Sequence, residues 1–421
     1  MRPMSVNGME SVLERQLTKK WVLVFGVVLL GFAVVTAWLA SKRQGQDFGV
    51  IYAVAIGIAK GAPIYGSEWQ KVAFADWGLP PVKNVPYPPS AGFMALPFAL
   101  LSYDHARTLW FLVMAAAVIL GVRGLIRLIF PKSAPGLWIF SAAAILLTSC
   151  IRWGMTPLQG APLVFGLLAA MVVALHTGRP RLAAFIAACV TALKFTVAFP
   201  FLALLLLHRL YREFLGAVIF VGFLNVIGFA RMGGMPAVDA YRSGLQGHEL
   251  SGTVDSPDPW DLQSVARLDW PYMLNGLFGE FDGFKFVAVA AFGLVCLWLF
   301  VRANSLKPPI SLETTAIFLA AFICVNLLVV YHHHYDLSPL LVPLIVFVAR
   351  YNDTHHFSHK TSWFLMSPLV LMMAAMPMAL SKTYADLFLG PAGQGLVNML
   401  FPIATTMMLV GSLTLVYRLG H

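Results

Sequence analysis

Charge is scarce in this sequence. Asp, Glu, Lys and Arg make up 11% of the 421 residues, whereas hydrophobic residues make up 59%. A soluble domain carries about a quarter charged residues, so a large soluble domain is excluded. Apolar runs of bilayer length recur from end to end, and they predict an all-α polytopic membrane protein with a single domain over residues 1–421.

Motifs for nucleotides and for redox chemistry are also missing. The chain has no G-x-x-x-x-G-K-[ST], no G-x-G-x-x-G that opens a helix and no C-x-x-C. We therefore expect no nucleotide or redox cofactor, and because no acid is paired with Asp47 we expect no metal. The four cysteines lie in apolar runs and are interpreted as small buried hydrophobic residues: Cys150, Cys189, Cys296 and Cys324.

The basic residues lie mostly in short loops between apolar runs. This positive-inside pattern accounts for the net charge of +10, and it predicts membrane lipids as partners and no nucleic acid. It also predicts about twelve spans with both termini in the cytoplasm. In this topology residues 1–20 form a cytoplasmic tail, residues 41–107 a first outer loop and residues 231–283 a second long outer loop.

The first outer loop contains two apolar stretches, 47–60 and 91–101, that are too short to span. A span needs about 20 residues, so both stretches are interpreted as helices lying along the membrane surface. Asp47 heads the first stretch and has two interpretations. It is either a helix N-cap with a favourable dipole contact or a carboxylate held at the membrane surface as a general base.

A lysine interrupts the apolar run of residues 182–207. Lys194 lies near its middle, and basic residues flank the run on both sides. Two basic flanks predict a hairpin of two short helices, with Lys194 lining a cavity within the depth of the membrane. The alternative is one long tilted helix with a snorkelling lysine.

The predicted outer face gathers the groups that a transferase with a lipid-linked sugar donor needs. The phosphate of such a donor needs cations, and the acceptor hydroxyl needs a base, for which Asp47 is the candidate. The candidate cations are Lys194, Arg152 and Arg267, and the candidate positioning side chains are Gln159, Gln263, Ser264, His332, His333 and His334. Arg152 and the three histidines can also be explained as interfacial anchors.

Four stretches, taken in order, resemble the GT-C integral-membrane glycosyltransferases of family 87, the polyprenol-phosphate-mannose-dependent α-1,2-mannosyltransferase-like branch. They are Asp47-Phe48-Gly49-Val50 with residues 61–65 and Tyr87-Pro88-Pro89; Gln159 with Gly178-Arg179-Pro180, Lys194 and Pro200; Leu262-Gln263-Ser264-Val265; and residues 331–335. The chain departs from the family at Leu158-Gln159-Gly160-Ala161, where Gly-Gln-x-Asn is frequent, and at Leu262, where the family has Asn.

The resemblance implies a GT-C fold, Asp47 as the catalytic carboxylate, Tyr87 among the positioning residues and a polyprenyl-phosphate sugar donor. We therefore predict an enzyme that moves a sugar, by resemblance mannose, to a hydroxyl of a glycolipid or lipid-linked glycan. The reaction is expected at the outer face of a bacterial-type plasma membrane. The alternative is a transporter or flippase for a lipid or lipid-linked sugar, which would also use an intramembrane lysine and broken helices but predicts an internal repeat that the sequence lacks.

Overall fold

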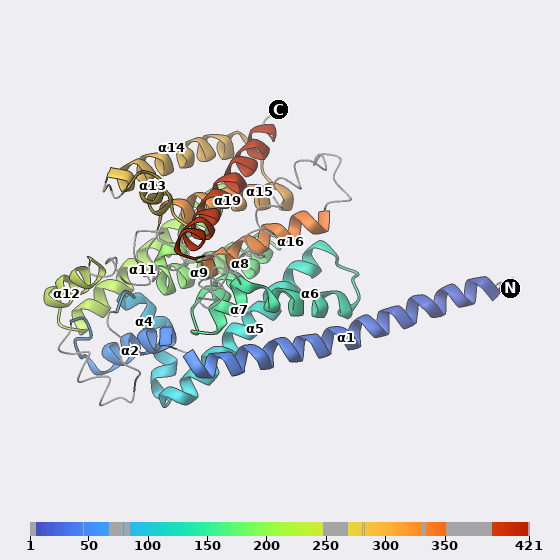
Figure 1. Ribbon diagram of the computed structural model, residues 1–421, viewed down its shortest axis with the longest axis horizontal. Helices are drawn as coiled ribbons and strands as arrows, with labels where there is room; N and C mark the ends of the chain where they lie inside the picture. Colours follow the sequence, from blue (N-terminus) through green and yellow to red (C-terminus); the bar gives the residue numbers. More distant parts are fainter. Residues whose placement is uncertain are drawn as a thin grey trace.

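The computed structural model describes residues 6–44, 46–66, 79, 85–246, 268–279, 281, 283–330, 334–350 and 390–419. Within these ranges the regular structure is helical throughout, and no strand is present (Figure 1). The helices are α1 (Val6–Gln44), α2 (Gln46–Lys60), α4 (Pro89–Ala95), η1 (Leu96–Leu100), α5 (Tyr103–Ile129), α6 (Pro135–Leu147), α7 (Ser149–Met155), α8 (Ala161–His176), α9 (Pro180–Leu193), η2 (Phe195–Val197), α10 (Phe199–Leu207), α11 (Tyr211–Arg231), α12 (Met235–Gln246), α13 (Trp270–Phe278), α14 (Gly283–Ser305), α15 (Leu312–Val329), η3 (His334–Leu340), α16 (Leu341–Arg350) and α19 (Gly390–Arg418).

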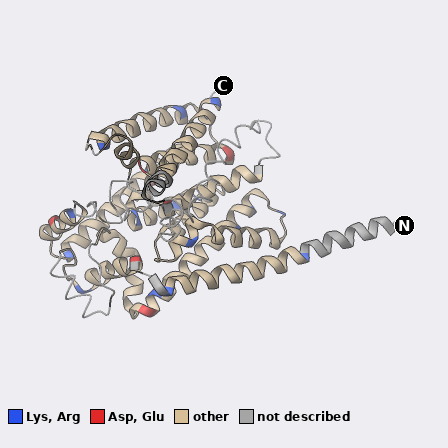
Figure 2. Ribbon diagram, viewed as in Figure 1, with Lys and Arg blue, Asp and Glu red and all other residues tan. Residues whose placement is uncertain are grey.

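The long apolar helices make this a multi-pass membrane protein. In the described ranges six helices are long and apolar enough to cross a bilayer, or up to seven if the bent pair α6–α7 is one span. Shorter apolar helices, among them α8, α9 and α16, lie between them. One of the roughly twelve spans expected from the sequence falls within residues 351–389, which lie outside the described ranges. Figure 2 shows the long helices almost free of charge, with Lys and Arg near their ends.

Residues 41–107, the predicted first outer loop, hold the two short helical segments that the sequence predicts, and these segments pack together. They are α2 and the continuous pair α4–η1. Residues 48–58 of α2 are all buried, because this helix is apolar on every side. Its far end is also fixed: Arg231, at the end of α11, donates hydrogen bonds to the carbonyl oxygens of Ile58 (2.9 Å) and Ala59 (3.3 Å).

The structure confirms that the run 182–207 is broken into two short helices. Helix α9 ends at Leu193, Lys194 leaves the helical conformation with φ −147° and ψ 81°, and α10 begins at Phe199 after the short turn η2. The single long helix is therefore wrong. The placement of both flanks in the cytoplasm stays a prediction.

Glycines bring α5 and α8 into backbone contact. A Cβ atom placed on Gly166 of α8 would lie 2.3 Å from the carbonyl oxygen of Ala117, and one on Gly121 would lie 3.0 Å from the backbone of Gly166. Small residues that let helix backbones approach are typical of tight packing inside membranes. This pair forms part of the main core, to which α2 attaches through Phe48 and Trp110.

Candidate functional site

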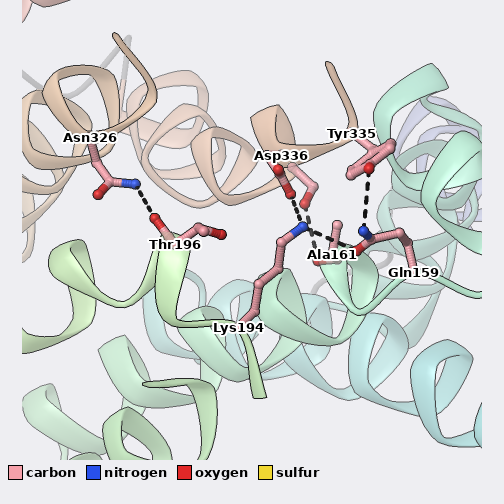
Figure 3. Close-up of polar contacts among 8 residues, drawn as sticks. Gln159, Ala161, Lys194, Thr196, Asn326, Tyr335 and Asp336 are labelled. Atoms are coloured by element: carbon pink, nitrogen blue, oxygen red, sulfur yellow. Dashed lines mark hydrogen bonds and ion pairs between the residues drawn. The ribbon is translucent and has the colours of Figure 1, made fainter. Parts of the chain in front are cut away.

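Lys194 lies at the centre of a polar group that three segments of the chain build together (Figure 3). Its ammonium is ion-paired with Asp336 of η3 and donates a 3.0 Å hydrogen bond to Oε1 of Gln159. It also lies over the ring of Tyr335, 5.0 Å from the centroid. Gln159 Nε2 donates to the Tyr335 hydroxyl at 3.2 Å, which closes the group. We call Lys194, Asp336, Gln159 and Tyr335 the lysine group.

The charges of the lysine group are buried between apolar helices. Lys194 is 8% exposed, Asp336 is 4% exposed and Gln159 is 7% exposed. Removing two charges from water costs several kcal/mol per ion, and a buried pair repays this only when its remaining hydrogen bonds are satisfied. Gln159 and the Tyr335 ring supply such contacts to the ammonium. Charged groups kept at this cost are by default functional.

The loop before α8 places Gln159, and three elements hold its backbone. The amide of Asp47 donates to Pro157 O (3.0 Å), Trp110 Nε1 donates to Leu158 O (3.1 Å), and the amide of Gln159 donates to Gly154 O (2.8 Å). Leu158 has a φ of 61°, in the left-handed region that non-glycine residues rarely adopt. Such strain persists only when the surroundings over-determine it, as these three bonds do.

The hydrogen bond from Asp47 to Pro157 connects the predicted base to the lysine group. Asp47 lies in the first turn of α2, where the helix dipole favours a negative charge, and its side chain is partly buried. The next residue, Phe48, is fully buried and stacks on Trp110 at a centroid distance of 5.2 Å. The start of α2 is therefore fixed both by packing and by its backbone.

The charges of both carboxylates, Asp47 and Asp336, act on Tyr87. Burial raises the pKa of Tyr87 well above its ordinary value of 10, and the charges of Asp47 and Asp336 raise it further. Both carboxylates therefore act on the Tyr87 phenol through their charge. The phenol stays protonated at neutral pH and can act as a hydrogen-bond donor.

The remaining candidate residues either form no hydrogen bond or ion pair with the lysine group or lie outside the described ranges. Arg152 is on α7 with its side chain exposed. The backbone of His334 begins η3, but its side chain is outside the description. Arg267, Gln263, Ser264, His332 and His333 lie outside the described residues.

Sequence reasoning missed Asp336 and Tyr335 as members of the site. A usable signal existed, because ionisable residues within membrane segments pair with one another. Asp336 stands at the start of an apolar stretch and was the natural partner for Lys194. Within the described ranges, no three His, Cys, Asp or Glu side chains gather closely enough to hold a metal ion.

The arrangement suits the recognition of an anion. Lys194 supplies a cation with three donors, Gln159 and Tyr87 supply polar contacts, and Asp47 supplies a carboxylate. Because the Asp336 carboxylate is paired with the ammonium, an arriving anion has to compete with Asp336 for Lys194. This competition follows from the charges of the three groups alone.

Comparison with known protein families gives one result. The sequence model of glycosyltransferase family 87 matches residues 85–331, more than half of the chain. The match covers Tyr87, Gln159 and Lys194, whereas Asp47 and Asp336 flank it. No curated protein matches the chain. From the extent of this match, the multi-pass membrane protein described above belongs to glycosyltransferase family 87.

Proposed function

We propose that this glycosyltransferase moves mannose from a polyprenyl phosphate to a hydroxyl of a glycolipid or lipid-linked glycan. The reaction takes place at the outer face of a bacterial-type inner membrane, with both termini of the chain in the cytoplasm. The observation that carries the proposal is the lysine group: a buried ammonium at a helix break, joined through one loop to the helix whose first turn contains Asp47.

Asp47 acts as the base in this proposal. The acceptor hydroxyl oxygen forms a bond to the anomeric carbon of the sugar while its proton passes to the Asp47 carboxylate. The bond between the anomeric carbon and the phosphate oxygen breaks, and its electron pair stays on the phosphate. No redox partner is needed, and atoms and charges balance.

Lys194 takes up the charge that forms on the leaving group. A phosphodiester carries one negative charge, and the polyprenyl phosphate that leaves gains a second. The ammonium becomes available to it as the phosphate replaces the carboxylate of Asp336. Gln159 and Tyr87 orient the sugar or the phosphate, and exposed Arg152 meets the phosphate from the solvent side. Arg267, Gln263, Ser264 and the histidines 332–334 complete the proposed site.

A transfer assay tests the proposal directly. Membranes that contain the protein are incubated with radiolabelled polyprenyl-phosphate mannose and their endogenous lipid acceptors. We expect label to move into a glycolipid or lipid-linked glycan, and to stay on the donor in membranes that carry Asp47→Asn. Donor that crosses the bilayer without losing its sugar would instead support the flippase alternative.

A further inference from the structure

The break at Lys194 leaves backbone carbonyl groups that no helix can satisfy. A break within a membrane protein is tolerated only where other groups satisfy the freed backbone. Near Lys194 some of this is done locally, since the amide of Lys194 bonds Val190 O (2.8 Å) and the amide of Val197 bonds Lys194 O (3.1 Å). Two further carbonyls, one on each side of Lys194, are reached by side chains from distant helices.

Ser90 holds the carbonyl before the break. Its hydroxyl, on α4, donates a 3.0 Å hydrogen bond to Ala192 O, two residues ahead of Lys194. Ser90 is fully buried, and its own amide donates to Asn225 Oδ1 of α11 at 3.0 Å. The backbone of Ser90 is thus fixed by a second contact.

Asn326 holds the carbonyl after the break. Its side-chain amide, on α15, donates a 2.8 Å hydrogen bond to Thr196 O, two residues beyond Lys194 (Figure 3). Asn326 is 3% exposed in a helix that is otherwise buried and apolar over the same turn. A buried side-chain amide at such a position needs a hydrogen-bond acceptor, and the Thr196 carbonyl is that acceptor.

We propose that Ser90 and Asn326 are positioning residues for the donor phosphate. By binding the carbonyls on either side of Lys194, they hold the break in one conformation and thereby fix where its ammonium meets an anion. Helix α4 adds a second connection, because a Cβ on Gly92 would lie 2.6 Å from Val54 of α2. The same short helix therefore packs on the helix of Asp47 and holds the segment of Lys194. The inference rests on the proposed phosphate site.

Binding of polyprenyl phosphate to purified protein tests the inference apart from catalysis. Asn326→Leu and Ser90→Ala, on different helices, should each weaken this binding about tenfold, the usual order of effect when a buried carbonyl loses its partner. In the transfer assay the KM for the donor should rise while kcat changes less. Ser412→Ala is the matched control, since the buried Ser412 hydroxyl donates to Met408 O inside an unbroken helix. It should change neither quantity.

A double-mutant cycle separates positioning from general structure. In a Lys194→Met background both substitutions should lose their effect on phosphate binding, because there is no ammonium left to position. Equal losses with and without Lys194, or unchanged binding in both single variants, would overturn the inference. If the wild-type protein transferred no sugar, that result would count against the proposed function alone. The double-mutant cycle measures phosphate binding, which does not depend on sugar transfer.

Discussion

Two polar groups lie at opposite ends of the same helices, and only one of them contains an ion pair. The lysine group joins the break between α9 and α10 to the start of α8 and to η3. A second group, His176, His208 and Thr315, joins the end of α8, the end of α10 and the first turn of α15. We call it the histidine group. At about 1.5 Å per residue, the length of α8 separates the two by about 24 Å.

The histidine group is neutral and complete in itself. The Thr315 hydroxyl donates its one hydrogen to Ser311 O at 2.9 Å. It therefore accepts hydrogen bonds from Nε2 of His176 (3.1 Å) and of His208 (3.2 Å), and both rings carry their hydrogen on Nε2. Burial, with His176 nearby, lowers the pKa of His208 from 6.5 to about 4, so the ring stays uncharged at neutral pH.

The difference separates a stabilising group from a functional one. Neutral hydrogen bonds that satisfy each other explain the histidine group through stability alone. A buried ion pair contributes little net stability, and apolar residues of similar volume often replace it without loss. Stability therefore does not explain Lys194 and Asp336, whereas the anion binding proposed above does. Perturbing each group in turn tests this contrast.

The largest effect is expected at Asp47, the proposed base. Asp47→Asn keeps a good residue for the start of a helix, so the protein should fold and bind donor. Turnover should fall roughly 100-fold or more, because an amide cannot take the acceptor proton. Donor binding and turnover are measured on the same purified protein. Asp104→Asn is the control, since Asp104 lies in the first turn of α5 and is exposed; near wild-type turnover in Asp47→Asn would remove the catalytic role.

Breaking the ion pair should reduce both stability and donor binding. Lys194→Met removes the cation from the buried Asp336 carboxylate, which costs about 3–5 kcal/mol of unfolding free energy. The double variant Lys194→Met/Asp336→Leu should regain most of this stability but not the affinity for donor. Unfolding midpoints in detergent and donor KM are compared for both variants. Recovery of donor affinity in the double variant would contradict a phosphate role for Lys194.

Breaking the histidine group should change stability alone. Thr315→Val leaves the N–H groups of two partly buried rings without their acceptor, which costs about 1–3 kcal/mol. The KM for donor should stay at the wild-type value. Thr414→Val removes a comparable but exposed hydroxyl, bonded to Val410 O, and should leave the unfolding midpoint unchanged. A raised KM in Thr315→Val would show that the two ends of the helices are coupled.

The smallest effect is a pH dependence confined to the histidine group. Because the pKa of His208 is lowered from 6.5 to about 4 in the folded protein, the unfolded chain binds more protons between these values. The stabilisation is complete above pH 6.5 and is lost as the pH falls towards 4. His208→Gln keeps an N–H donor without titrating, so its unfolding midpoint should vary less over this range. An equal dependence in wild type and variant would assign the titration elsewhere.

The sequence predicted the helix break because composition and charge both pointed to it. Two basic flanks around an apolar run of this length do not fit one span, and Lys194 stands where the run must turn. Gln159 was nominated as a polar side chain of the predicted outer face, but its contact with Lys194 could not be foreseen, since it depends on a strained turn at Leu158. Such a turn is held by Trp110 and Asp47, which are distant in sequence.

The partners of the break escaped prediction for a different reason. Ser90 and Asn326 are ordinary polar residues within apolar stretches, and nothing local distinguishes them from residues that bond their own helix. The burial of α2 was likewise hidden, because its all-round apolar character suits a membrane surface as well as a protein core. Tertiary packing decides between such outcomes, and sequence periodicity does not encode it.

The contact between α5 and α8 has a consequence for motion. With Gly166 against the backbone of Ala117, the two helices have no space to slide or rotate independently, so they behave as one rigid body. Segment η3, which carries Tyr335 and Asp336, is instead a 3-10 helix, whose hydrogen bonds are geometrically poorer than those of an α-helix. When a phosphate displaces Asp336, we expect the backbone of η3 to move as a hinge while α5 and α8 stay in place.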